Sequence, residues 1–413
     1  MKPFFFFSSI VLLLLIGCTE GPLLIQPDWQ QSTAFSIAPY DFSLKIGQNP
    51  DLDAQAAGVN QSFIGNYGQA LHWFDEERAP VKKKSLLLDT ILQTYHFTEA
   101  IPHILERAEA HEMLIINEAH HISLHRVFTQ HLLQGLYDRG YRHFGLETLN
   151  TQPAAIKKLN ENGRVSYDSG YYTRDPRFAE LIRTAQRIGF HLFPYESLDE
   201  AQEREAGQAE NIAAYIGANP NGKVLIHCGY DHGAETSFGG KTPMMAGKVA
   251  TILDLDPLTI NQSQYTERST IAFDDPLLSI FDAHEPSVLI NESGDSFSPW
   301  LAAIQDGISM GMDFKMGMDI YVFHPSVKLQ HGRPDFFFSD HLRPFQIDLS
   351  KSSVGFPALL YVFQPGDDRE TTVPFDVVEV NGPEIVLGLP KGPFELVLID
   401  GVNSTEEAFI EID

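Results

Sequence analysis

EMLIINEAHHISLHR, residues 112–126, predicts a buried strand that ends in polar residues and is followed by a helix. Its first part, Glu112–Ile116, is rich in Ile and Leu, which is typical of a strand covered on both faces. Apolar residues then recur at helical spacing, at Ile122, Leu124, Phe128, Leu132 and Leu136. Ligands of open α/β sheets bind just beyond the carboxyl ends of the strands, and one acid and three histidines of this stretch fall there.

Three later apolar segments repeat this pattern. Tyr141–Glu147 ends in an acid, His191–Tyr195 is followed by Glu196, and Lys223–Cys228 is followed by the sequence GYDHG. Shorter apolar runs that could add strands are Leu258–Ile260, Val288–Ile290 and Ile320–Phe323. Because the strands alternate with helical patterns, the sequence predicts an α/β fold with a mostly parallel sheet and helices on both faces.

Helix boundaries are expected where capping residues stand. Asp175-Pro176 supplies an N-cap and a proline at the first helical position, and Gly189 ends that helix. Ser197–Glu200 resembles a capping box for the next helix. Before the central strand, Leu86–Phe97 and Ile101–Ala110 are expected to form two helices.

Four strand ends thus deliver polar side chains to one edge of the predicted sheet: Glu118, Glu147, Glu196 and His232. Strand ends on the same side of a parallel sheet converge, so the repetition on every strand points to a site. A single acid at such a place is equally often a helix cap or a solvated loop residue, and Glu196 is the residue for which that interpretation is strongest.

The histidines of the opening stretch have two chemical uses. His120 and His121 stand at an expected helix N-terminus, where the helix dipole favours a neutral ring that can act as a base or a ligand. His121 and His125 have the i, i+4 spacing of metal ligands, with His232 as a third candidate ligand. His125 and Arg126 could equally line a site for an anionic substrate. The remaining histidines considered are expected to be structural or exposed: His103, His111, His131, His143, His191 and His227.

These motifs resemble a known superfamily. Asn117-Glu-Ala-His120 with His125, then Gly145-Leu-Glu147, then Gly229-Tyr-Asp-His232, followed by Gly239-Gly240 and Pro243, occur in its order. The superfamily includes erythromycin esterase-like hydrolases, ChaN-like haem-binding lipoproteins and TIKI/TraB-type proteins. The resemblance covers residues 85–255, and Asn117 departs from it, because Gly is usual at that position.

The resemblance implies two different activities. In the esterase-like branch His121, or else His120, acts on water as a general base, while Glu118, Glu147 and His232 orient it and stabilise charge. Apart from the resemblance, the candidates for substrate contact are His125, Arg126, Glu196 and Tyr230. In the ChaN-like branch the protein binds iron or haem through a tyrosine that cannot be assigned to a position here.

The residues alone support similar chemistry. A neutral histidine held by carboxylates is suited to abstracting a proton from water. The same side chains could hold a divalent metal ion that activates water. No Gly-x-Ser-x-Gly motif directly follows an expected strand, as a nucleophile elbow requires, and Cys228 lies inside an expected strand, so a covalent serine or cysteine mechanism is disfavoured.

The N-terminus predicts export. Lys2 precedes the apolar run Phe4–Ile16, which is too short for a membrane-spanning helix of about 20 residues. The run ends in Leu15-Ile-Gly-Cys18, which resembles the bacterial lipoprotein signal and implies a lipidated Cys18. We therefore expect a lipid-anchored protein of the bacterial cell envelope, more often in the outer membrane. The alternative is an ordinary secretory signal.

Composition narrows the range of partners. The chain has 29 Lys and Arg against 55 Asp and Glu, a net charge of −26, which would repel nucleic acid. A small-molecule or cationic partner is expected instead. Once Cys18 carries lipid, Cys228 has no cysteine partner, so the fold has to be held by its core.

The rest of the chain predicts three further regions. Residues 19–84 are expected to form a tether and loosely structured covering segments, and 85–344 the α/β domain. Met310–Met318 contains four methionines, which bind Cu(I) in some proteins but fill core gaps far more often. Six short strands in residues 345–413 predict a small antiparallel β-sandwich domain.

Together these patterns favour an exported lipoprotein that hydrolyses an ester or amide, with small-molecule substrate and no nucleic acid. A haem- or iron-binding lipoprotein without catalysis is the alternative, and an inactive binding scaffold is a third.

Overall fold

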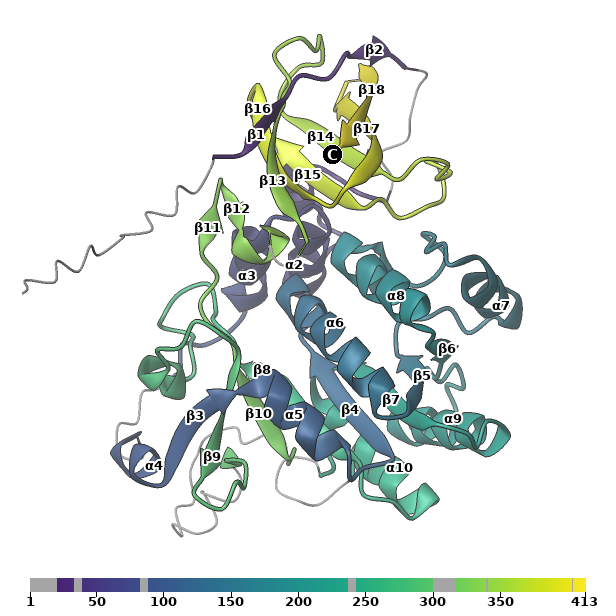
Figure 1. The fold of residues 1–413 in the computed structure, drawn as a ribbon, viewed down its shortest axis with the longest axis vertical. Coiled ribbons are helices and arrows are strands. Elements are labelled where there is room, and N and C mark those ends of the chain that lie inside the picture. The colour runs from purple at the N-terminus through teal and green to yellow at the C-terminus, as the bar shows by residue number, and fades with distance from the viewer. Residues whose placement is uncertain are drawn as a thin grey trace, which may run out of the picture.

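A computed structural model describes residues 21–32, 39–81, 88–236, 243–299, 317–338, 341–402 and 404–413. Figure 1 shows a large sheet with helices packed against it and, at one end of the molecule, two smaller sheets. The signal segment with Cys18 and most of the methionine-rich stretch, up to Met316, lie outside the described residues. Within these ranges no helix is both long enough and apolar enough to cross a membrane.

The large sheet has eight strands in the order β3-β9-β10-β8-β4-β7-β5-β6. Their bounds are β3 Tyr95–Glu99, β4 Met113–Glu118, β5 Tyr141–Leu146, β6 His191–Pro194, β7 Lys223–Gly229, β8 Leu258–Tyr265, β9 Ser287–Asn291 and β10 Ile320–Phe323. Six neighbouring strands, β10 to β6, are parallel, and only β9 pairs antiparallel with β10 and β3. The predicted α/β class with a mostly parallel sheet is confirmed.

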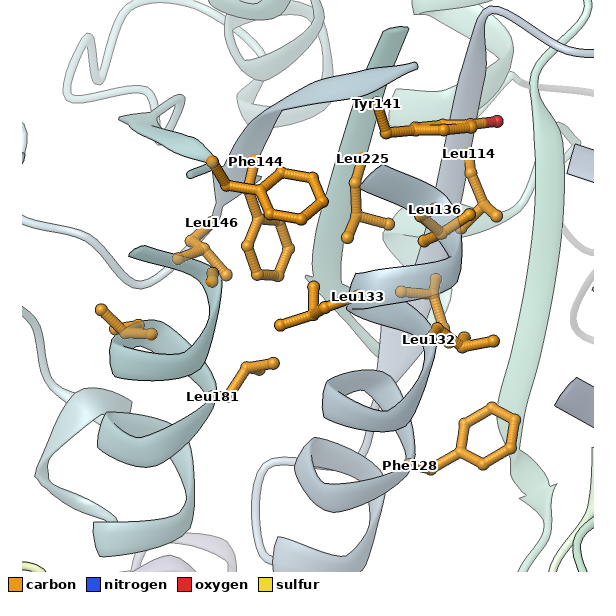
Figure 2. Close-up of a cluster of buried hydrophobic side chains, with 14 of the residues drawn as sticks. Leu114, Phe128, Leu132, Leu133, Leu136, Tyr141, Phe144, Leu146, Leu181 and Leu225 are labelled. Atoms are coloured by element: carbon orange, nitrogen blue, oxygen red, sulfur yellow. The ribbon is translucent and has the colours of Figure 1, made fainter. Parts of the chain in front are cut away.

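Helices cover both faces of this sheet. One face carries α5 (Ala100–Ala108), α6 (Ser123–Asp138) and α8 (Pro176–Ile188), and the other carries α9 (Arg204–Ala218) and α10 (Met245–Leu253). In Figure 2 apolar side chains of α6 and α8 meet those of β4, β5 and β7: Leu132, Leu133, Leu136, Leu181, Leu114, Phe144 and Leu225. Each is at most 2 % exposed, and burying one such side chain contributes about 1.5–3 kcal/mol.

Two expected helices differ from the structure. The segment Leu86–Phe97 contains a short helix, α4 (Leu88–Thr94), and then the edge strand β3. Tyr95 and Phe97 are two residues apart and both pack on one cluster, which is the period of a strand. The helix expected after the Ser197 capping box begins only at Arg204. Ser197 lies against this helix instead of capping it, since a Cβ on Gly207 would lie 2.3 Å from the Ser197 hydroxyl.

The interval 19–84, expected to be loosely structured, contains the helices α1 (Ser43–Gln48), α2 (Ala54–Phe63) and α3 (Tyr67–Glu76). The sequence of α2, AQAAGVNQSF, has no clear apolar stripe, which explains why it was missed. Small residues bring α2 close to α3, since a Cβ on Gly58 would lie 3.0 Å from the Ala70 carbonyl. A further helix that the sequence analysis did not identify is α7 (Pro153–Asn162).

The six strands expected in residues 345–413 are all present and belong to two sheets. Three strands pair in the order β1-β13-β16 and five in the order β15-β14-β17-β18-β2. Their bounds are β1 Leu23–Ile25, β2 Gln30–Gln31, β13 Arg343–Asp348, β14 Ala358–Phe363, β15 Asp376–Val380, β16 Glu384–Leu389, β17 Gly392–Asp400 and β18 Thr405–Ile412. One apolar cluster lies between the sheets, and β1 and β2 from the N-terminus complete them, β1 running parallel to β13.

Candidate functional site

The carboxyl ends of β4, β7 and β5 meet in that order. Glu118, the last residue of β4, is opposite Gly229, the last residue of β7, and His227 of β7 is opposite Leu146 of β5. The two predicted acids, Glu118 and Glu147, therefore come from strands that do not pair, with Gly229 between them. We call Glu118, His120, Glu147 and Gly229 the strand-end cluster.

Glu118 is a buried carboxylate held by Arg126. Arg126 Nε donates to Glu118 Oε2 at 2.8 Å and its Nη2 donates to Oε1 at 2.9 Å, a bidentate pair. Both side chains are at most 2 % exposed. Burial raises the pKa of Glu118, but the Arg126 charge and a hydrogen bond from His120 outweigh it and hold the pKa well below the ordinary value. Arg126 Nη1 also contacts Asp175, which accepts a 2.6 Å bond from Ser123.

His120 is oriented by this carboxylate. Its Nδ1 lies 2.9 Å from Glu118 Oε1, and since a carboxylate only accepts, Nδ1 carries the proton. The ring stacks on Tyr172 with a centroid separation of 3.8 Å and meets the edge of Tyr230 at 4.9 Å. Nε2 has no hydrogen-bond partner within the described ranges, and the residue keeps 7 % exposure. That nitrogen is available to accept a proton.

Glu147 lies on the opposite side of the same histidine. A Cβ built on Gly229 would lie 2.4 Å from His120 Nε2 and 3.2 Å from Glu147 Oε2, so both groups approach one glycine. The Gly229 N–H donates to Glu147 Oε2 at 2.5 Å, and Arg204 Nη2 donates to Oε1 at 2.6 Å. Burial raises the pKa of Glu147, but His232, His120 and the backbone bond lower it overall, which keeps the group ionised.

Glu196 and His232 lie in an outer polar layer. Arg204 Nε donates to Glu196 Oε1 at 3.0 Å while Arg204 Nη1 lies 2.8 Å from His232 Nε2. His232 Nε2 is 3.6 Å from Glu147 Oε1, and its Nδ1 is 2.7 Å from Glu205 Oε1. Glu196 and His232 therefore both lie at the expected edge. Arg204 links Glu196 to Glu147, and His232 contacts Glu147 directly.

His121 lies apart from the acids. It is fully buried and stacks on Phe74 of α3 at a centroid separation of 3.6 Å. Its Nδ1 is 3.4 Å from the Tyr230 hydroxyl, and its buried Nε2 has no partner. Burial lowers its pKa well below the ordinary value, and the nearby Arg268 and Arg78 lower it further. Of the two candidate bases, only His120 contacts Glu118.

His125 does not converge with His121 on a common ion. The Ala119 N–H donates to His125 Nδ1 at 3.0 Å, and Nε2 lies 2.9 Å from the Thr266 hydroxyl, so both nitrogens are occupied. Arg126, a second candidate for substrate contact, is already paired with Glu118 and Asp175. Over the described residues no group of three or more His, Cys, Asp or Glu is placed to hold a metal ion.

Several site residues were missed by the sequence analysis. His227, expected to be structural or exposed, is buried with its Nε2 3.7 Å from Glu118 Oε2. It precedes Gly229 by two residues, which puts both on the same face of β7 and is a signal that the sequence contained. Tyr172 and Arg204 carry no comparable signal, because their roles depend on how separate elements pack. Asp175 was recognised only as a helix cap, which it is, through a 2.7 Å bond from the Arg177 N–H.

Comparisons with known proteins give little similarity. No protein-family model matches the chain, and no curated protein matches it. Among solved structures, the type III effector HopBA1 matches at 13 % identity and TM-score 0.28, over 42 % of this chain and 89 % of the effector. RRSP, a MARTX toxin effector domain from Vibrio vulnificus CMCP6, matches at 18 % identity and TM-score 0.30, over 53 % of this chain and 46 % of that one.

A structure of bacterial protein toxins matches at 19 % identity and TM-score 0.30, over 51 % of this chain and 44 % of that one. This chain thus covers less than half of the two toxin structures. Structural matches with such low TM-scores do not indicate an activity for this chain.

Proposed function

We propose that this protein hydrolyses an ester or amide and that His120 is the general base. The observation that carries the proposal is the position of the His120 ring between two carboxylates. Nδ1 is held by buried Glu118, and the Nε2 edge faces Gly229 beside Glu147 and stays partly exposed. A nucleophile needs a base that is itself oriented by a third group, and Glu118 supplies that orientation.

Each residue of the strand-end cluster has a separate task in this proposal. His120 Nε2 takes a proton from water as the water oxygen attacks the substrate carbonyl carbon, and later returns a proton to the leaving oxygen or nitrogen. Glu118 and Glu147 stabilise the imidazolium that forms between these steps. Arg126 keeps Glu118 ionised and in place, which makes it a positioning residue.

A divalent metal ion does not fit these residues. Both oxygens of Glu118 are bonded to Arg126, one of them also to His120, and both nitrogens of His125 are bonded. The unpartnered nitrogen of His121 is shielded by Phe74. Haem ligation by tyrosinate fits no better, because burial raises the pKa of both tyrosines beside His120, Tyr172 and Tyr230.

The test is turnover of a panel of activated esters and anilides by the chain that begins at residue 19. We expect His120→Ala to lower kcat/KM by about 10²- to 10⁴-fold. Glu118→Gln should lower kcat with little effect on KM. His191→Ala, at an exposed histidine of β6, is the matched control and should retain activity.

Added imidazole should restore part of the activity of a His120→Gly variant, which a structural role for His120 would not permit. Full activity in His120→Ala, or its loss in His121→Ala alone, would contradict the assignment. Saturable haem binding near one equivalent per chain, followed by absorbance on the same sample, would favour the non-catalytic alternative.

We also propose that the chain is exported and anchored to the bacterial envelope through lipidated Cys18, which the sequence motif supports. Expressed cells labelled with radioactive palmitate should yield a labelled protein in the membrane fraction. Cys18→Ser should abolish the label, whereas Cys228→Ser should not.

A further inference from the structure

A cavity of about 740 Å³ opens at the carboxyl ends of β8 and β10, and no residue of the strand-end cluster lines it. Its lining comes from α6, from residues 267–286 and from residues 324–336, with Ile101 of α5. Its volume lies within the range of small-molecule sites, about 300–1,000 Å³. Neither His120 nor Glu147 lines it, so it is a separate place in the fold.

The wall of this cavity combines apolar and acidic side chains. Its apolar surface comes from all three segments and includes Val127, Phe128, Phe281 and Phe336. The acidic lining residues are Glu267, Asp274, Asp275, Asp282, Glu285 and Asp335. The one lysine or arginine among the described lining residues is Lys328. An anionic ligand would be repelled there, and an organic cation would be attracted.

Two of these acids are already under electrostatic stress. Burial raises the pKa of Glu267 and of Asp275, and Asp274 adds a smaller increase to both. Hydrogen bonds to both carboxylates, and the Arg268 charge at Asp275, offset only part of this rise. A cation in the cavity would relieve this repulsion, because it stabilises both carboxylates in their charged form.

His324 supplies a second, independent observation. It follows β10 directly, is 1 % exposed and lines the cavity, yet neither of its ring nitrogens has a hydrogen-bond partner in the described part of the chain. Burial lowers its pKa to about 3, so the ring is neutral and offers one N–H donor and one acceptor. Buried polar groups are nearly always hydrogen-bonded, which makes this pair of free nitrogens a place for a ligand group.

We propose that this cavity binds an organic amine: an apolar body with a protonated amino group at the acidic rim formed by Asp282 and Glu285 and a hydroxyl-type group hydrogen-bonded to His324. Asp282 and Glu285 are the exposed members of the acidic set, which places them at the entrance, while His324 is at the buried end. The site does not depend on the proposed hydrolysis.

The experiment is a calorimetric titration with 4-(4-aminobutyl)phenol and three analogues. The analogues replace the amine by a hydroxyl, replace it by a carboxylate, or lack the phenol hydroxyl. We expect the amine to bind at least tenfold more tightly than the alcohol and the carboxylate not to bind. Raising the salt concentration should weaken the amine alone.

Variants test the two ends of the cavity separately. Asp282→Asn with Glu285→Gln should weaken the amine about tenfold and leave the alcohol unchanged. Glu210→Gln with Glu411→Gln, which makes the same charge change at exposed residues of α9 and β18, is the control and should have little effect. His324→Leu should remove the advantage of the phenol hydroxyl and keep the preference for the amine.

Absence of binding by all four compounds would overturn the proposal, as would equal affinity for amine, alcohol and carboxylate, or an amine affinity that the rim variants leave unchanged. Since His120 does not line the cavity, His120→Ala should bind the amine like the unaltered chain. An inactive hydrolase with an intact amine site would therefore contradict the proposed function only.

Discussion

At the scale of single residues, the site depends on a glycine that allows two side chains to meet. Gly229 has extended backbone angles that any residue could adopt, φ −81° and ψ 144°. Its importance is steric, because a Cβ on Gly229 would lie 2.4 Å from His120 Nε2 and only 3.2 Å from Glu147 Oε2. A Gly-x-x-His motif therefore contributes to this site through its glycine as much as through its histidine.

We expect Gly229→Ala to displace His120 and to lower kcat/KM by about 10²-fold, the scale of a misplaced catalytic group. Circular dichroism should show that the chain still folds. Gly68→Ala is the matched control, because a Cβ there would meet no atom within 4 Å. Unchanged activity in Gly229→Ala would show that His120 does not need its present position.

The buried ion pairs of Arg126 with Glu118 and Asp175 are the second important feature at this scale. Arg126→Met leaves Glu118 and Asp175 as uncompensated buried carboxylates, which should lower the free energy of unfolding by about 3–5 kcal/mol. Urea unfolding measures this change. Arg139→Met, which removes a partly exposed pair with Glu109, should cost about 0–1 kcal/mol. Equal losses in the two variants would refute the difference that burial is expected to make.

At the scale of elements, the strand-end regions bury several histidines in neutral form. Burial lowers the pKa of His227 to about 4, and it lowers those of His121 and His125 well below 6.5. Unfolded histidines take up protons near pH 6.5, whereas these folded ones do so only at lower pH. Their contribution to stability is therefore complete above about pH 6.5 and is lost as the pH falls towards 4.

The free energy of unfolding should accordingly fall between about pH 6.5 and pH 4, by roughly 1.4 kcal/mol per pH unit for each such proton. His227→Asn should reduce this slope by about one proton. His96→Asn, at an exposed histidine of β3, is the control. A slope that His227→Asn leaves unchanged would mean that His227 titrates alike in both states.

At the scale of the whole molecule, the two small sheets are joined to the α/β part by apolar packing and by buried hydrogen bonds. The outer face of the five-stranded sheet packs on α1 and α2. In Figure 1, α2 lies between this sheet and the large sheet. Arg177 of α8 donates to the Phe375 carbonyl at 2.7 Å. Buried Arg333 forms an ion pair with Asp376, the first residue of β15: Nη1 donates to Oδ2 at 2.5 Å and Nη2 donates to Oδ1 at 3.0 Å. We expect these parts to unfold together.

Asp376→Asn should therefore lower the melting temperature of one shared transition, because it leaves a buried Arg333 without its anion. Scanning calorimetry should show a single peak in both proteins, coincident with the loss of helical circular dichroism. Asp413→Asn, at the exposed last residue, is the control. Two separated peaks would show that residues 345–413 form an independent domain.

The six parallel strands of the large sheet, and the position of Glu118, Glu147 and His232 at one edge of it, could be predicted from the sequence alone. These follow from local hydrophobic periodicity and from the geometry of parallel sheets, which need no knowledge of distant contacts. Helix α2 was not predicted because most of its buried positions are small or polar, so no apolar stripe marks it. Helix α3 does bury Tyr67, Leu71 and Phe74 at helical spacing, a signal that the sequence contained.

Which histidine contacts the acids depends on the three-dimensional packing and could not be predicted from the sequence. His120 and His121 are adjacent in sequence, and the turn after β4 directs one towards Glu118 and the other onto Phe74 of α3. The three-dimensional packing also placed β7 between β4 and β5, and joined three distant segments into the cavity around His324. Side-chain direction and long-range packing depend on residues far away in the sequence, so a local sequence pattern does not predict them.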